Sequence, residues 1–163
     1  MIDNINKLIG KPFDQIAFAC KNRPHQALAA SVMGGEWVED EVLAEGFVHG
    51  KASMNRAHLM FNYDGPVEHE LLCYLSGDNW VNYIDFGVGE RFVLSHLGWH
   101  VEDAFMTSEL LLPMFKVAQE VVTLSHTNPY LIEQRRTYRY IIHDSRASLG
   151  FDIKLIERIQ ADG

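Results

Sequence analysis

The sequence of 163 residues is short of the features that mark several common protein classes. It has two cysteines, Cys20 and Cys73, without CxxC spacing, so it offers neither a disulfide framework nor a zinc-binding cysteine motif. No apolar run approaches the ~20 residues that cross a bilayer, and no basic region followed by an apolar run opens the chain. GxSxG and P-loop motifs are also missing. We therefore expect buried, reduced thiols in a cytoplasmic protein without a membrane partner.

Positive charge is also scarce. The chain has 14 Lys and Arg residues against 22 Asp and Glu residues, a net charge of −8 and a pI near 5.4. Such a protein repels phosphates, which argues against nucleic acid as a partner but allows a small-molecule ligand in a locally positive pocket. The apolar fraction of 47% is typical of one globular domain, here residues 1–163. It also leaves enough apolar residues for an interface once the core is filled, which predicts a homodimer.

Apolar runs separated by turn signals predict the same order of strands and helix in each half of the chain. Together the two halves would form an α+β domain. Pro24 is suited to the first turn of the first helix. Thr107 and Ser108 offer an N-cap to the second, with Pro113 near its first turn. In the first half we expect a strand at 13–20, a helix at 26–33 and strands at 36–49, 56–63 and 67–75. In the second half we expect a strand at 92–101, a helix at 109–119 and strands at 121–126, 136–143 and 149–159.

Two segments of the first half recur in the second at matched positions. Residues 15–22 align with 96–103, an offset of 96 − 15 = 81, and residues 67–72 align with 151–156, an offset of 154 − 70 = 84. Pseudo-repeat modules at 12–79 and 91–160 can therefore place equivalent strands around one cavity. Strand alternation puts Gln15, Glu70, His96 and Lys154 on the cavity face, and Trp99 on the opposite face in the core.

Four motifs carry a resemblance to a known family: DQIAF at 14–18, EHELL at 68–72, SHLGWHVED at 95–103 and GFDIKLI at 150–156. With the repeated order of elements, they resemble the vicinal oxygen chelate superfamily, the group of glyoxalases, bleomycin-resistance proteins and extradiol dioxygenases. The resemblance implies two βαβββ modules. These would form an open, eight-stranded, cup-shaped mixed sheet with helices on the outer face.

The resemblance also implies a divalent metal in the cup, held by one residue from the first and last strand of each module. The matching positions are Gln15, Glu70, His96 and Lys154. The first three can supply oxygen and nitrogen ligands to zinc, nickel, manganese or iron. The family usually has a glutamate at the fourth position, and a protonated lysine cannot ligate a metal.

Three interpretations of Lys154 stay open. In the first, a metal site with three protein ligands and open positions survives. In the second, Lys154 replaces the positive charge of the metal and forms an ion pair with Glu70. In the third, the register slips and Asp152, which shares the face of Lys154, becomes the fourth ligand.

Other polar residues are candidates for binding a substrate. His100 continues the cavity face of its strand, and Arg139 or Arg158 can hold a carboxylate or phosphate in bidentate fashion. A solvated face of paired charges is the alternative for both arginines. His126, which precedes Thr127-Asn128-Pro129 at the end of a strand, is interpreted as a turn residue, with a place at the rim of the cup as the alternative.

Two functions follow from the resemblance. The first is a glyoxalase-like, metal-dependent lyase or isomerase for a small, oxygen-rich carbonyl or acid substrate. It would work through an enolate-like intermediate, with Glu70 as the catalytic base. The second is a metal-free protein that binds or sequesters a small molecule on the same scaffold. The metal content of the protein separates the two.

Overall fold

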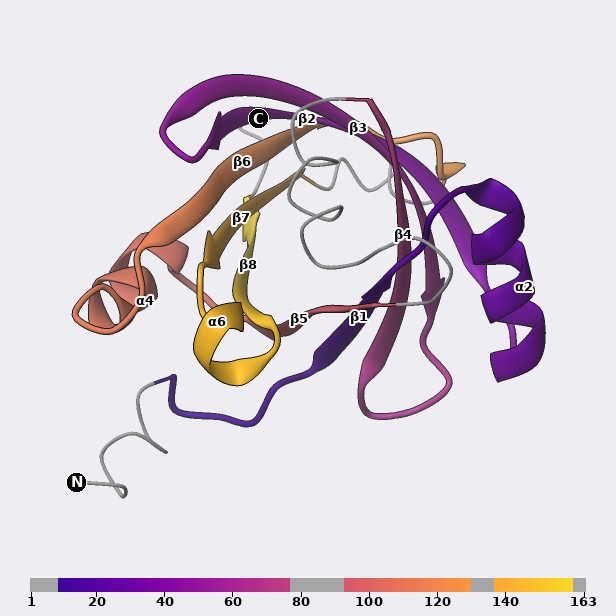
Figure 1. Cartoon of the computed structure of the whole chain (residues 1–163), viewed down its shortest axis with the longest axis horizontal. Coiled ribbons are helices and arrows are strands. Elements are labelled where there is room, and N and C mark those ends of the chain that lie inside the picture. The colour runs from indigo at the N-terminus through magenta and orange to yellow at the C-terminus, as the bar shows by residue number, and fades with distance from the viewer. Residues whose placement is uncertain (1–8, 77–92, 130–136, 160–163) are drawn as a thin grey trace.

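The strands form one sheet that closes on itself, with the helices outside it (Figure 1). The structure is a computed structural model, and it describes residues 9–76, 93–129 and 137–159. The elements of the first half are β1 (Gln15–Ala19), α2 (Arg23–Met33), β2 (Val38–Val48), β3 (Lys51–Asn62) and β4 (Glu68–Ser76). Those of the second half are β5 (Val93–His100), α4 (Ala104–Leu111), β6 (Val117–Ser125), β7 (Thr137–His143), α6 (Arg146–Leu149) and β8 (Asp152–Ile159).

The two halves of the chain join at two places in the ring of strands. The order of strands is β1-β4-β3-β2-β6-β7-β8-β5, and antiparallel pairing of β2 with β6 and of β1 with β5 closes it. Within each half, the first and last strands are parallel neighbours. The expected α+β class, mixed sheet and outer helices are confirmed. An open cup was expected, and the structure instead closes the sheet by hydrogen bonds between its end strands. The two halves that pair in this way belong to one chain.

The register of these parallel pairs matches the two halves residue by residue. Gln15 lies opposite Glu68 on β4, and His96 lies opposite Asp152 on β8. Two residues further along, Ala17 pairs with Glu70 and Gly98 with Lys154. Gln15 and His96 therefore occupy corresponding places, as do Glu70 and Lys154. This is the alignment that the two offsets in the sequence predict.

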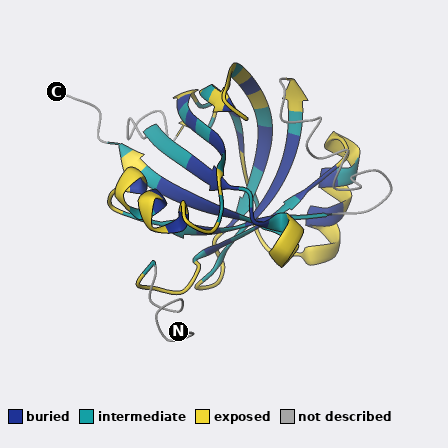
Figure 2. Cartoon of the chain, turned by 60° about the vertical axis from the view of Figure 1, so that its left-hand side comes forward, coloured by how far each residue is buried: buried dark blue, intermediate teal, exposed yellow. Residues whose placement is uncertain are grey.

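The helices pack on the outer face of the sheet, over apolar clusters. Figure 2 shows buried residues along the strands and exposed residues on the outer sides of the helices. Cys20 and Leu71 are buried with two alanines of α2, and both cysteines are free and buried, as expected. Burial raises the pKa of the Cys20 thiol to about 12, so this thiol has little thiolate character. Trp99 packs against the cluster beneath α4, on the face opposite His96, as predicted.

The second helix lies earlier in the chain than the sequence analysis places it. Asp103 is the N-cap and accepts a hydrogen bond from the backbone N–H of Met106, so α4 begins at Ala104. Pro113 follows the helix instead of opening it, and β6 begins at Val117. The prediction was wrong because Thr107 and Ser108 were preferred to the earlier aspartate as caps.

The starts of β3 and of the last strand also differ. Strand β3 begins at Lys51, ahead of the expected residue 56. The expected start of the last strand at residue 149 is instead the end of the short helix α6, which Gly150 closes in the left-handed conformation at φ 84°. The expected boundaries at residues 79, 91, 92, 136 and 160 lie outside the described residues. Among the described residues, no helix is long and apolar enough to cross a membrane.

Candidate functional site

The closed sheet surrounds a cavity with two lobes. Glu70 on β4, Tyr140 on β7 and Lys154 on β8 line both lobes, together with Val42 and Leu59. The two lobes contain about 550 and 420 Å³ of space between atoms, part of which opens to solvent. The first lobe, the larger one, is completed by Ala44, Asn55, Ala57, Leu72, Tyr74, His96, Gln119, Val121 and Ile142. The second lobe is completed by Gln15, Asp40, Phe61, Tyr63, Glu68, His100, His126, Tyr138 and Ile156.

A chain of hydrogen bonds links three of the cavity side chains across the join between the halves. Gln15 on β1 donates from its amide nitrogen to the Glu68 carboxylate, and its amide oxygen lies 2.8 Å from His96 Nε2 on β5. Ser95 Oγ lies 3.1 Å from the other ring nitrogen, Nδ1. Gly98 makes room for this arrangement, because a Cβ atom there would lie 2.9 Å from the Gln15 amide oxygen.

The surroundings of His96 determine its protonation. Burial and the nearby Lys154 charge lower the pKa of His96 well below its usual value, so the imidazole is neutral at pH 7. With Gln15 presenting an oxygen, Nε2 carries the proton and donates it, while Nδ1 accepts from the Ser95 hydroxyl. The nitrogen that faces Gln15 is therefore committed to a hydrogen bond.

Glu70 on β4 and Lys154 on β8 occupy corresponding places in the two halves, and both line the cavity. Their exposed fractions are 3% and 7%. Burial raises the pKa of Glu70, and the Lys154 charge counteracts this effect in part. The predicted ion pair is not in direct contact, because no Glu70–Lys154 approach within 4.0 Å occurs among the ion pairs of the described residues. The Lys154 ammonium instead lies 4.1 Å from the centre of the Tyr140 ring, a cation–π contact.

The residues at the family's four metal positions do not fit a divalent metal in this arrangement. Lys154 brings a positive charge and no free electron pair, while His96 Nε2 and the Gln15 oxygen bond to each other. Among the described residues, no group of three or more His, Cys, Asp or Glu side chains is placed to hold a metal ion. Of the three expected ligands, Glu70 is the one that takes no part in the Gln15–His96 hydrogen bond.

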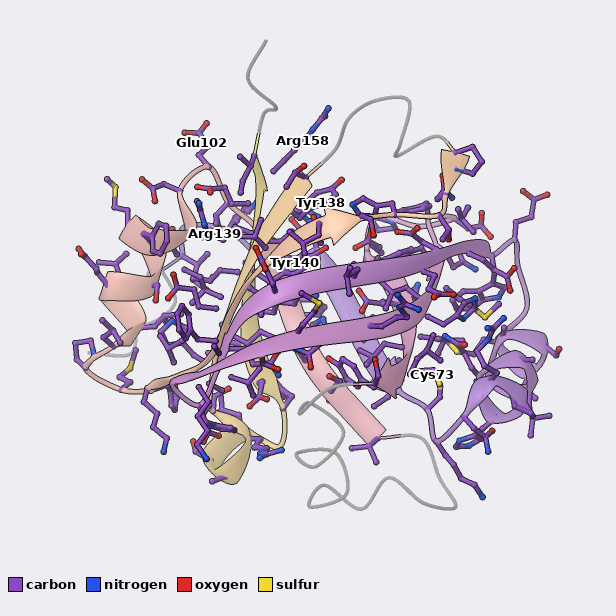
Figure 3. The ribbon with its side chains drawn as sticks, turned by 90° about the horizontal axis from the view of Figure 1, so that it is seen from above. Cys73, Glu102, Tyr138, Arg139, Tyr140 and Arg158 are labelled. Atoms are coloured by element: carbon purple, nitrogen blue, oxygen red, sulfur yellow. The ribbon has the colours of Figure 1, made fainter. Side chains whose placement is uncertain are left out.

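The structure separates the remaining candidates. His100 lines the second lobe, where its Nδ1 lies 2.8 Å from Asp14 Oδ1. Arg139 points away from the cavity, in contrast to its neighbours Tyr138 and Tyr140 (Figure 3), and pairs with Glu157 at 2.5 Å. Arg158 is exposed near the end of β8. The two arginines therefore do not line either lobe with the other candidates.

Asp152, the fallback ligand, also lies outside both lobes. Its carboxylate accepts hydrogen bonds from the backbone of Ser145 and Arg146, at the start of α6. One of its oxygens, Oδ1, is buried without a hydrogen-bond partner. In this position Asp152 holds the turn that leads into β8.

The burial of Asp152 predicts a pH dependence of stability. Burial, as the main cause, raises the pKa of Asp152 from 3.8 to about 6. The folded state therefore binds this proton more tightly than the unfolded chain, so the contribution is full below pH ~3.8 and is lost as the pH rises through about 6. Relative to wild type, Asp152→Asn should gain about 1–3 kcal/mol between pH ~4 and ~7. Urea unfolding across that range measures it; a constant difference between the two proteins would contradict the assignment.

Four polar side chains that line the cavity were not selected as site residues from the sequence. Asp40 and His126 pair in the second lobe, with Asp40 Oδ2 at 2.7 Å from His126 Nδ1. Asn55 and Gln119 are buried in the first lobe. A signal for Asp40 was present, because it shares the inward face of β2 with Val42 and Ala44. For His126 the signal was its place at a strand end, and the structure favours the alternative at the cup over the turn interpretation, since His126 lines the second lobe.

Comparison with known proteins bears on the fold. No protein-family model and no curated protein matches the sequence. Among solved structures, the chain is similar to methylmalonyl-CoA epimerase from Mycobacterium tuberculosis, with 13% identity and a TM-score of 0.51 over 93% of this chain and 91% of that one.

Two further solved structures have the same overall arrangement. A mutant of 4-hydroxymandelate synthase from Streptomyces coelicolor has 14% identity and a TM-score of 0.52, over 93% of this chain and 50% of that one, so this chain spans half of it. A hypothetical protein from Bacillus halodurans has 13% identity and a TM-score of 0.50, over 93% of this chain and 97% of that one. At such identities the likeness concerns the fold.

Proposed function

We propose that this chain, whose fold is that of the vicinal oxygen chelate superfamily, is an isomerase or lyase for a small carbonyl or acid substrate. The reaction passes through an enolate-like intermediate, with Glu70 moving the proton and Lys154 stabilising the oxygen. The observation that carries the proposal is that a buried carboxylate and a buried ammonium face one cavity. The epimerase among the similar structures agrees with the general kind of chemistry.

The two charges have complementary roles. The Glu70 carboxylate takes a proton from the carbon next to the carbonyl group, and the electrons of that C–H bond form the enolate, with negative charge on oxygen. Burial raises the pKa of Glu70, which makes its carboxylate a stronger base than an exposed one. The Lys154 ammonium, packed on Tyr140, offers positive charge to the oxygen in a site of low dielectric constant. Return of the proton to the other face of that carbon, or to the neighbouring carbon, completes an isomerisation. In a lyase reaction the enolate electrons form a C=C bond while a group on the neighbouring carbon leaves with its bonding electron pair.

This proposal assigns to Lys154 the charge that a metal would supply. The sequence predicts zinc, nickel, manganese or iron at Gln15, Glu70 and His96, and the donor set of these residues does not suit them, because Gln15 and His96 bond to each other. Metal-free binding of a small molecule is the second candidate, supported by the cavity's mixture of apolar walls and buried Asn55 and Gln119 amides. A homodimer remains a prediction.

Proton exchange in heavy water tests the proposal. Small 2-oxo and 2-hydroxy acids, and their esters, are incubated in D₂O with protein freed of metals by a chelator, and the loss of the α-proton signal is followed by ¹H NMR. We expect wild type to accelerate exchange of at least one compound, and Glu70→Gln to lower that rate at least ~100-fold, since it removes the base.

Glu45→Gln, at an exposed position on β2, is the matched control and should exchange like wild type. Wild type that catalyses no exchange, or a Glu70→Gln variant that exchanges normally, would remove the enzyme proposal in favour of binding. Exchange that requires added metal would contradict the role of Lys154.

A further inference from the structure

Asp40 and His126 form a buried pair that neither the proton transfer nor the family's metal positions use. Asp40 Oδ2 lies 2.7 Å from His126 Nδ1, and Oδ1 accepts hydrogen bonds of 2.9 Å from the backbone N–H groups of Thr127 and Asn128. The side chains of Asp40 and His126 are 1% and 8% exposed. Three hydrogen bonds thus hold the carboxylate, and the carboxylate holds the imidazole.

The other ring nitrogen of His126 is left without a partner by the part of the chain that the structure describes. Nε2 is buried and has no hydrogen-bond partner among the described residues. A carboxylate only accepts, so in the neutral form of the ring the proton lies on Nδ1 and Nε2 has a free electron pair. An unpaired buried acceptor is costly, and this one belongs to a residue that lines the second lobe. Among the described residues this acceptor has no partner, and a molecule bound in the second lobe can supply one.

Aromatic side chains stand on both sides of this nitrogen. Phe61 of β3 and Tyr63 stack with ring centres 5.8 Å apart, and Tyr138 and Tyr140 of β7 stack at 6.1 Å. In the ring of strands, β2 and β6 lie between β3 and β7. Asp40 lies on β2 and His126 directly after β6, so the two aromatic pairs flank the pair of polar residues. His126 also meets the Tyr138 ring edge to face, at 6.3 Å.

We infer that the second lobe is a subsite for a planar aromatic ring that carries a hydroxyl group. The ring lies between the two aromatic pairs, and its hydroxyl donates a hydrogen bond to His126 Nε2. Aromatic walls favour a flat ring by stacking and edge contacts. The free electron pair of His126 Nε2 selects a group that donates, which a phenol does and an ether does not. The charged residues Glu70 and Lys154 line the same lobe, so a polar substituent on the ring can reach them.

Phenol and its methyl ether, anisole, are the probes. Both are titrated into the full-length protein, and dissociation constants are taken from NMR shifts. The ¹⁵N shift of His126 Nε2 is followed in the same samples. We expect phenol to bind about tenfold more tightly than anisole, and only phenol to move the Nε2 signal as a new hydrogen bond does. Equal binding of the two probes, no binding of phenol, or an unmoved Nε2 signal would each overturn the inference.

Variants then separate the hydrogen bond from the walls. His126→Phe keeps a ring and removes the nitrogen, so the preference for phenol over anisole should disappear; retained preference would overturn the inference. Tyr138→Leu should weaken both probes alike. His69→Phe, on the outward-facing side of β4, is the matched control and should keep the preference. These measurements involve no turnover, so their outcome is independent of the proton-exchange test of Glu70.

Discussion

Replacement of Lys154 by glutamate should raise the affinity of the cavity for Zn²⁺, Ni²⁺ or Mn²⁺ at least ~100-fold. The change exchanges a repelling ammonium for an anionic ligand beside Glu70 and His96, on a strand whose register already matches that of β4. A unit charge ~4 Å from another contributes roughly 4 kcal/mol at an effective dielectric constant of ~20, and here the sign of one charge is reversed. The neutral His96 ring becomes a ligand through Nε2 when its hydrogen bond to Gln15 gives way and its proton moves to Nδ1, beside Ser95 Oγ.

Isothermal titration and elemental analysis of wild type, Lys154→Glu and Lys154→Gln measure the effect. The glutamine variant removes the repulsion without adding an anion, so it separates the two contributions and should gain less. Stoichiometric, tightly held metal in the wild type would contradict the fit described above. It would also return the enzyme proposal to the metal-dependent form that the family resemblance implies.

The cavity face of each strand could be predicted from alternation alone. Gln15, Glu70, His96 and Lys154 all point inward, because side chains alternate along a strand and the opposite faces are apolar. The repeat in the sequence correctly matched Glu70 with Lys154, since the two parallel strand pairs have the same register. Local pattern and periodicity were sufficient for these features.

Partners on neighbouring strands that are far apart in the sequence could not be predicted in the same way. The Gln15–His96 hydrogen bond depends on the antiparallel pairing of β1 with β5, and Asp40 meets His126 only because β2 pairs with β6. A sequence gives the face of a residue, but not which distant strand lies opposite. Arg139 shows the limit of composition as a guide: its positive charge suggested a substrate anion, and it pairs instead with Glu157 on the outside.

Asp40→Ala should be among the most destabilising single substitutions in the barrel, with a loss of about 3–5 kcal/mol in the free energy of unfolding. The carboxylate is 1% exposed and is the acceptor for one imidazole and two backbone N–H groups. Alanine leaves all three donors unpaired in a buried site, where each unsatisfied group is costly. Urea unfolding at neutral pH, with wild type alongside, measures the loss.

Two companion substitutions identify the cause of that loss. Asp40→Asn retains an oxygen for the backbone N–H groups of Thr127 and Asn128 but turns an amide donor towards His126, so we expect an intermediate loss. Glu41→Ala, on the same strand, removes a solvent-accessible ion pair with Arg56 at 3.6 Å and should cost no more than about 1 kcal/mol. If Asp40→Ala cost no more than Glu41→Ala, the pair with His126 would not be a rigid support. The free Nε2 of His126 would then move with its loop, and a directed acceptor in the second lobe could not be maintained.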